Sequence, residues 1–331
     1  MVGLEALRFP GPGWNARAIA GVFICAAALA LGGCAGMWPQ TAELREGLPQ
    51  GLPEKVELTQ VPFFPQEDYQ CGPAALATAL ASFGVKVTPE ELVAQVYLPE
   101  RKGSLQVEML AAARRHGLVS YQLAPRFEDL LRELAGGTPV IVLQNLGLRD
   151  GWHYAVAVGY DYETGQLILR SGTTERQVLA FTMHEMVWKR SGYWAMVAMP
   201  PDRIPVTASE QRWLGAVAAL ERAGGAHNAR LAYTHFLKRW PDNVTAAVGL
   251  ANAHHSLGAL PEAERVLRAA LARDPDSVIV LNNLAQTLSD QGRNAEALPF
   301  IERAVERAGS GGPFAAAVSE TRDTIRQRLK K

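Results

Sequence analysis

A 34-residue period in the carboxy-terminal part of this chain constrains its fold more than any other feature. The dipeptide Pro-Asp occurs at positions 241 and 275, and alignment on it gives three units that begin near Glu210, Val244 and Val278. A glycine recurs at the same place in each unit, as Gly224, Gly258 and Gly292. A small residue follows it each time, as Ala229, Ala263 and Ala297. The period predicts stacked helix pairs, each of which buries its apolar face only against its neighbours.

The period, the turn glycine, the small alanine and the closing proline resemble tetratricopeptide repeats. The third unit ends in the glycine-rich residues 309–312 instead of a proline, and a capping helix is expected over residues 315–330. The resemblance implies an all-α solenoid over residues 209–331, with three repeats and a cap, that binds a protein partner. An ordinary helix bundle is the alternative.

The amino terminus has the features of a targeting segment. Residues 18–33 form an uncharged apolar run preceded by Arg8 and Arg17. The run is shorter than the roughly 20 residues that a membrane-spanning helix needs. A basic flank, a short apolar stretch and small residues at its end predict a signal peptide over residues 1–33.

The end of this segment, Leu-Gly-Gly-Cys at 31–34, resembles the lipobox of bacterial lipoproteins. The resemblance implies that the signal peptide is removed and that Cys34 carries lipid. Because Ala35 and not aspartate follows, it also favours an outer-membrane anchor that faces the periplasm. The alternative is a plain secretory signal or an amino-terminal anchor in which Cys34 is incidental.

Composition and cysteine count exclude several classes. The chain is 48% hydrophobic and 20% charged, which excludes wholesale disorder, and its 33 basic and 33 acidic residues lack the basic excess of a nucleic-acid binder. Of its three cysteines, Cys25 would leave with the signal and Cys34 would be acylated, so Cys71 would remain without an intramolecular partner. No Cys-x-x-Cys pair indicates zinc, and we expect no metal and no cofactor.

The remaining sequence divides into a tether, a mixed domain and a linker. Residues 34–58 are rich in Gly, Pro, Gln and charge and predict a tether. Residues 59–200 begin with predicted helices, at 72–83, from the Thr88 N-cap, at 104–116 and at 127–134. Strands are predicted after them, at 139–143, 153–161, 166–170 and 192–199. Helices followed by an antiparallel sheet indicate an α+β domain, and residues 201–208 are expected to link it to the repeats.

Cys71 and His153 are the candidate chemical groups of this domain. Cys71 lies directly before a predicted helix, whose unpaired N–H groups favour an anion and would lower the pKa of the thiol. A nucleophilic cysteine also needs a base, usually a histidine distant in sequence. His153 opens an apolar strand after a turn, which is a place where a rigid scaffold can hold a base. The alternative is a buried thiol and a core histidine.

The motifs around these residues resemble papain-like cysteine peptidases, most closely those that process bacteriocins after double-glycine leaders. Cys-Gly-Pro-Ala-Ala at 71–75 follows a glutamine, and His-Tyr-Ala-Val-Ala-Val-Gly-Tyr stands at 153–160. The resemblance implies that Cys71 is the nucleophile and that His153 is the general base that then protonates the leaving amine. An upstream glutamine would help to form the oxyanion hole, and we assign Gln66 because Gln70 is adjacent to the nucleophile.

Two positions depart from the family pattern. The family glutamine usually stands six residues before the cysteine, where this chain has Pro65. The third catalytic member, usually Asp or Asn on the following strand, is replaced by Ser171. A serine can orient an imidazole but cannot offset the charge of an imidazolium. We therefore expect a weaker catalyst or another side chain in this role.

Together these features predict a lipid-anchored envelope cysteine peptidase that hydrolyses peptide bonds and whose repeats bind a protein substrate or partner. One alternative is a catalytically degenerate scaffold that binds peptides during envelope assembly. A transpeptidase or amidase is another, because it would use the same thiolate and base.

Overall fold

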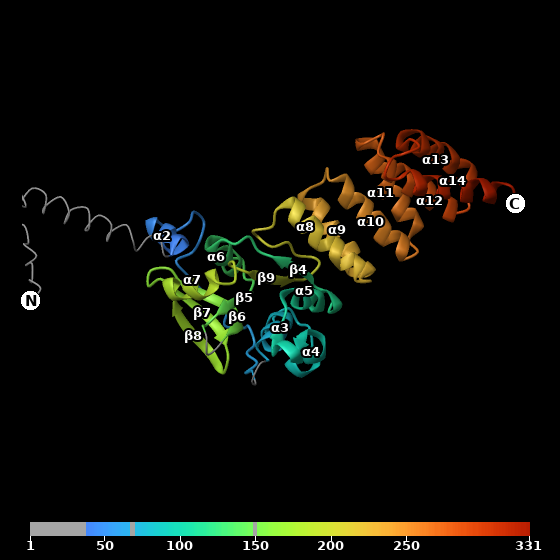
Figure 1. Ribbon diagram of the computed structural model, residues 1–331. Helices are drawn as coiled ribbons and strands as arrows, with labels where there is room; N and C mark the ends of the chain where they lie inside the picture. Colours follow the sequence, from blue (N-terminus) through green and yellow to red (C-terminus); the bar gives the residue numbers. More distant parts are fainter. Residues whose placement is uncertain (1–37, 67–69, 148–150) are drawn as a thin grey trace, which may run out of the picture.

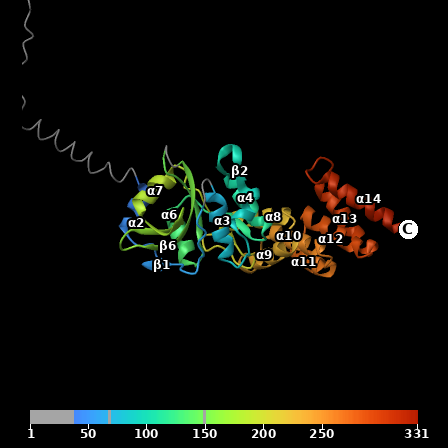
Figure 2. The same cartoon turned by 90° about the horizontal axis from the view of Figure 1, so that it is seen from below.

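The computed structural model describes residues 38–66, 70–147 and 151–331 (Figures 1 and 2). The predicted signal peptide over residues 1–33 and the predicted lipidation site at Cys34 lie outside the described residues. Within them, no helix combines the length and the apolar character needed to cross a membrane.

An antiparallel sheet organises the amino-terminal α+β domain, as the sequence predicts. Among the described residues it has seven strands in the order β4-β9-β5-β6-β7-β8, and β1 pairs with one end of β6. The strands are β1 (Lys55–Glu57), β4 (Val119–Gln122), β5 (Val140–Asn145), β6 (Trp152–Asp161), β7 (Gln166–Ser171), β8 (Thr174–Ala180) and β9 (Ala195–Met199). A separate hairpin joins β2 (Tyr97–Leu98) to β3 (Gly103–Ser104).

Helices cover both faces of the sheet (Figure 2). One face carries α3 (Cys71–Ala81), with α4 (Pro89–Val96) and α5 (Gln106–Arg115) beside it, and the other carries α6 (Phe127–Ala135) and α7 (Phe181–Lys189). The predicted start of α4 is confirmed, because the side chains of Thr88 and Glu91 each accept the other's backbone N–H. The predictions omitted β8, whose exposed polar residues lack an apolar alternation.

The predicted tether is instead largely part of the folded domain. From Pro39 the chain forms α2 (Pro39–Glu46), whose backbone N–H groups at Gln40 and Thr41 donate to the buried Glu185 carboxylate at 3.1 and 2.7 Å. Leu44 is buried, and β1 then joins the sheet. The prediction failed here because so short a helix, without an apolar period, is stabilised by tertiary contacts rather than by its own sequence.

The carboxy-terminal domain consists of three helix pairs and a final helix, consistent with tetratricopeptide repeats (Figure 1). The pairs are α8 (Glu210–Arg222) with α9 (Ala226–Arg239), α10 (Val244–Ser256) with α11 (Leu260–Arg273), and α12 (Val278–Asp290) with α13 (Asn294–Ala308). The final helix α14 (Ala315–Leu329) packs on α13 and α12.

The segment between the two domains is held against the first one. Thr207 donates to the buried Glu133 carboxylate through its backbone N–H at 2.8 Å and its hydroxyl at 2.6 Å. Burial raises the pKa of Glu133, although these hydrogen bonds oppose the shift. Beyond the segment, the fully buried Trp213 of α8 packs edge-on against Tyr121 of β4, with ring centroids 5.7 Å apart. Together the contacts of Thr207 and Trp213 hold the start of the repeats against the first domain.

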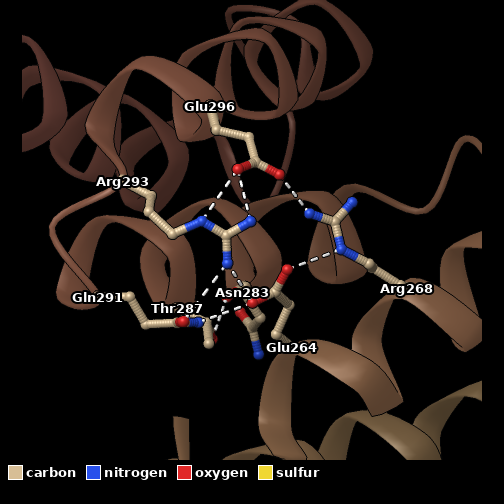
Figure 3. A network of polar contacts seen from close by, with 7 residues as sticks. All are labelled: Glu264, Arg268, Asn283, Thr287, Gln291, Arg293 and Glu296. Carbon is tan, nitrogen blue, oxygen red and sulfur yellow. Dashed lines mark hydrogen bonds and ion pairs between the residues drawn. The ribbon is translucent and has the colours of Figure 1, made fainter. Parts of the chain in front are cut away.

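A polar network joins the second repeat to the third (Figure 3). The Glu264 carboxylate accepts hydrogen bonds from Arg268 at 2.8 Å, Arg293 at 2.6 Å and Gln291 at 3.0 Å, and Glu296 binds both arginines. Partial burial opposes ionisation of Glu264, but these bonds outweigh it and lower its pKa to about 2. The network therefore links α11 of the second repeat to the helices of the third repeat.

Candidate active site

The candidate active site lies where strands β6 and β7 separate. Among the described residues, the two strands pair from Asp161 and Gln166 at one end to Val156 and Arg170 at the other. The residues just beyond this point on both strands include His153, Tyr154 and Ser171. The first turn of α3 packs against this opening, because α3 lies mainly on β6.

Cys71 is the first residue of α3 and is only 8% exposed. Its side chain lines a small cavity, together with Gln66, Thr78, Tyr154 and Ser171 among others. Burial raises the pKa of the Cys71 thiol, while hydrogen bonds from backbone groups of Tyr154, Gly72 and Cys71 itself oppose the shift. The helix N-terminus was expected to lower this pKa, but the loss of hydration outweighs it.

His153 lies at the start of β6 and is 8% exposed. Its Nε2 atom is 3.0 Å from the Oγ atom of Ser171. Ser171 lines the same cavity as Cys71 and Gln66. The structure therefore brings the four residues proposed from the sequence to one place, with Ser171 as the hydrogen-bonded neighbour of the imidazole.

Gln66 is the last residue of a segment, residues 55–66, that runs along the sheet to the site and that we call the strap. The strap begins as β1 on β6, and the Leu58 N–H donates to the Val158 carbonyl at 2.7 Å. At its other end the Gln66 N–H donates to the Gly172 carbonyl at 3.2 Å. The strap passes so close to Gly159 that a Cβ atom there would lie 2.3 Å from the Val56 carbonyl oxygen. A glycine in β6 is therefore needed for the strap to follow this path.

A second glycine allows β3 to pack closely against α3. A Cβ atom on Gly72 would lie 2.2 Å from the Ser104 Oγ atom. The Ser104 carbonyl accepts the Tyr154 hydroxyl at 3.2 Å. The glycine that follows Cys71 thus lets β3, α3 and β6 approach one another at the site.

Among the other histidines, His184 shows why sequence position alone is a poor guide to function. It lies in α7 and is fully buried. Its Nδ1 atom is 3.1 Å from the Gln144 amide, and its ring stacks on Trp188. Burial lowers the pKa of His184 to about 3, so the imidazole stays neutral. In the described parts of the chain, no group of three His, Cys, Asp or Glu side chains is placed to hold a metal ion.

Sequence reasoning missed two contributors to the site. One is the main chain of Tyr154, which hydrogen-bonds the Cys71 sulfur and follows from the topology rather than from a side chain. The other is Arg170, a buried residue that lines the cavity. A charged residue inside the apolar run Leu-Ile-Leu-Arg, directly before Ser171, was the available signal.

The state of the thiol gives a testable pH dependence. Because its pKa is raised, Cys71 is protonated at neutral pH and should become reactive only as the pH rises through a value above that of a free cysteine. We expect the rate of alkylation by iodoacetamide to be low at pH 7 and to have its midpoint above that of free cysteine. Rapid alkylation below pH 6 would instead indicate a preformed thiolate. Urea-unfolded protein is the control for an unperturbed thiol.

Comparisons with known proteins agree with this architecture. Residues 58–196 match the model of the Peptidase_C39 like family, and residues 214–277 and 260–313 match that of the tetratricopeptide repeat. A search of the curated proteins found no match.

Solved structures similar to each domain were also found. The peptidase domain of Streptococcus ComA, a bi-functional ABC transporter involved in a quorum-sensing pathway, is 21% identical, covers 42% of this chain and 98% of its own, and has a TM-score of 0.36. A double-glycine-motif protease from an AMS/PCAT transporter, in complex with the leader peptide, is 21% identical. The match covers 43% of this chain and 93% of the protease, with a TM-score of 0.35. The Yersinia enterocolitica type III secretion chaperone SycD, in complex with a peptide of the translocator YopD, is 16% identical. The match covers 37% of this chain and 97% of SycD, with a TM-score of 0.34.

The resemblance predicted from the sequence is thus confirmed at the level of the family. The chain combines a domain similar to C39 peptidases with a domain of tetratricopeptide repeats.

Proposed function

We propose that this protein is a cysteine peptidase that hydrolyses peptide bonds with Cys71 as its nucleophile. One observation carries the proposal: Cys71, at the start of α3, shares a cavity with Gln66 and Ser171, and Ser171 lies 3.0 Å from the His153 imidazole. A nucleophile, a base with an orienting partner and an oxyanion donor are the groups that acyl transfer needs.

In this proposal His153 acts as a general base at the moment of attack, because burial keeps the Cys71 thiol protonated at neutral pH. The sulfur attacks the peptide carbonyl, and the Gln66 amide and the Cys71 N–H stabilise the oxyanion. The imidazolium then protonates the leaving amine. Water hydrolyses the thioester and restores the thiol.

The direct test is the incubation of the purified protein with a library of peptides from a digested bacterial proteome. We expect mass spectrometry to detect new peptide termini that share a sequence motif and that a Cys71→Ala variant does not produce. Full recovery of the library with the wild-type protein would overturn the proposal. Peptides joined to an added amine would instead indicate a transpeptidase.

Ser171 offers a graded test of the third catalytic position. Ser171→Ala removes the hydroxyl beside His153 Nε2, and we expect about a tenfold fall in kcat because the imidazole loses its orientation. Ser171→Asp adds a carboxylate that stabilises the imidazolium, and we expect it to raise kcat above wild type. The measurement is the steady-state rate on one peptide from the library. Ser310→Ala, at an exposed loop residue, is the control, and equal rates for all variants would contradict this role.

The repeats provide the surface that we propose binds a protein substrate or partner. A groove between α10 and α12 is lined by amides, with Asn283 donating to Asn252 at 3.0 Å and Asn282 donating to Asn283 at 3.3 Å. The Asn282 Oδ1 atom is buried and has no partner among the described residues. Amides fixed in this way suit the main chain of an extended peptide.

We also propose that lipid on Cys34 anchors the protein in the bacterial envelope, at the outer membrane and facing the periplasm. The support is the lipobox-like sequence at 31–34. Incorporation of radiolabelled palmitate by the wild-type protein and not by Cys34→Ala tests the anchor. Release of Cys34→Ala into the soluble periplasmic fraction tests the location.

The second candidate function is a scaffold whose peptidase-like domain binds peptides without cleaving them. The buried thiol with a raised pKa and the serine in place of a carboxylate favour it. In the native cell, a Cys71→Ala strain with a wild-type phenotype, beside a null phenotype when residues 209–331 are deleted, would support the scaffold over the peptidase.

A further inference from the structure

We propose that Arg170 is a positioning residue that holds Gln66 in the oxyanion hole by fixing the path of the strap. The inference rests on the proposed function, because it assigns Gln66 a role in acyl transfer. Nothing in the sequence resemblance points to Arg170. The structure identifies it through its burial, its hydrogen bonds and its place between the strap and the catalytic strands.

Arg170 is a charged side chain in an environment that is costly for charge. It is only 8% exposed and lines the cavity that holds Cys71. Its Nη1 atom donates to the Glu175 carbonyl at 2.6 Å and its Nη2 atom to the Val61 carbonyl at 3.2 Å. Its Nε atom has no partner among the described residues. A buried guanidinium held by two carbonyl groups fixes the backbone segments to which it is bonded.

One of those segments is the strap. Backbone hydrogen bonds hold the strap to the sheet at Leu58 and again at Gln66. Val61 lies between these points, is 4% exposed, and its carbonyl is held by Arg170. The guanidinium thus ties the middle of the strap to β7. Loss of this bond would free residues 59–65 to move and would displace the Gln66 amide.

The same strand also positions the base. Arg170 pairs with Val156 at the last register position of β6 and β7, and Ser171 follows it and contacts His153. At the end of β7 the Arg170 side chain therefore bonds to the strap, whereas the Ser171 side chain, one residue later, contacts the imidazole. This difference lets an experiment separate the two roles.

The test compares two reactions of Cys71 in the full-length protein. Acylation by p-nitrophenyl acetate forms an oxyanion on the acetyl group, whereas alkylation by iodoacetamide forms none. Removal of an oxyanion donor slows acyl transfer by about a hundredfold or more. We expect Gln66→Ala to slow acylation by about a hundredfold and Arg170→Lys by about tenfold, with alkylation rates and their pH profiles unchanged.

The double variant gives the decisive comparison. If Arg170 acts through Gln66, then Arg170→Lys causes no further loss of acylation in a Gln66→Ala background. Arg176→Lys is the matched control, because Arg176 also binds the strap, at Glu57, but is half exposed, and it should acylate at the wild-type rate. Multiplied losses in the double variant, or an equal slowing of alkylation by Arg170→Lys, would overturn the inference.

Hydrogen exchange distinguishes failure of this inference from failure of the proposed function. We expect Arg170→Lys to raise amide exchange in residues 59–66 at least tenfold, while Arg176→Lys does not. A wild-type protein that is alkylated but never acylated would refute the peptidase proposal, whatever the exchange shows. Unchanged exchange in Arg170→Lys would refute the proposed role of Arg170 in holding the strap, even in an active enzyme.

Discussion

Cys71→Ala and His153→Ala are each expected to lower peptide hydrolysis by at least about a thousandfold, and the double variant is expected to lose no more than the weaker single variant. The losses should not multiply, because the base has no function without the thiol whose proton it accepts. The measurement is the initial rate of hydrolysis of a peptide selected from the library. Circular dichroism and thermal unfolding confirm that each variant is folded.

His116→Ala is the matched control for the base. His116 caps the end of α5 and its Nε2 atom is 3.2 Å from Gln95, so the variant should retain the wild-type rate. A His153→Ala protein as active as His116→Ala would remove His153 from the mechanism. Multiplied losses in the double variant would show that the two residues act in separate steps.

Trp213→Ala is expected to lower the free energy of unfolding by about 3–5 kcal/mol, because it removes a large, fully buried side chain. We expect this loss of stability to arise from a weakened contact between the domains. There Trp213 packs on Tyr121, and the Arg212 guanidinium donates to the Gln122 carbonyl at 2.8 Å. Urea unfolding followed by circular dichroism measures the change. Hydrogen exchange locates it, with the largest increase expected in α8 and β4.

Trp152→Ala provides the comparison, since Trp152 is 57% exposed. We expect it to change the free energy of unfolding by less than about 1 kcal/mol. If both variants unfold at the same urea concentration as wild type, the contact between α8 and β4 contributes little and the two domains are independent.

Much of the fold is predictable from the sequence because it depends on local patterns. The 34-residue period anticipates the three helix pairs, and the capping residues at Thr88 anticipate the start of α4. The parts that were missed depend on distant contacts. Helix α2 has no apolar period and is held by Glu185, which lies 144 residues beyond Thr41.

The same distinction applies to the candidate site. Cys71, His153 and Ser171 were identified because short motifs surround them, and the structure places them close to one another. The raised pKa of Cys71 was not foreseen, because a helix terminus is visible in the sequence whereas the depth of burial is not. Arg170 was missed for a related reason, since its partner Val61 is 109 residues away.

The contact that joins Thr207 to Glu133 and Trp213 to Tyr121 has a consequence for substrate choice. With the repeats fixed on the peptidase-like domain, a partner held in their groove would meet the candidate active site at a set separation rather than sampling a range of positions. In the proposed function, the number of residues between the bound segment and the scissile bond would then select the cleavage site. Two substrates with identical sequences around that bond could differ in rate solely because of this spacing.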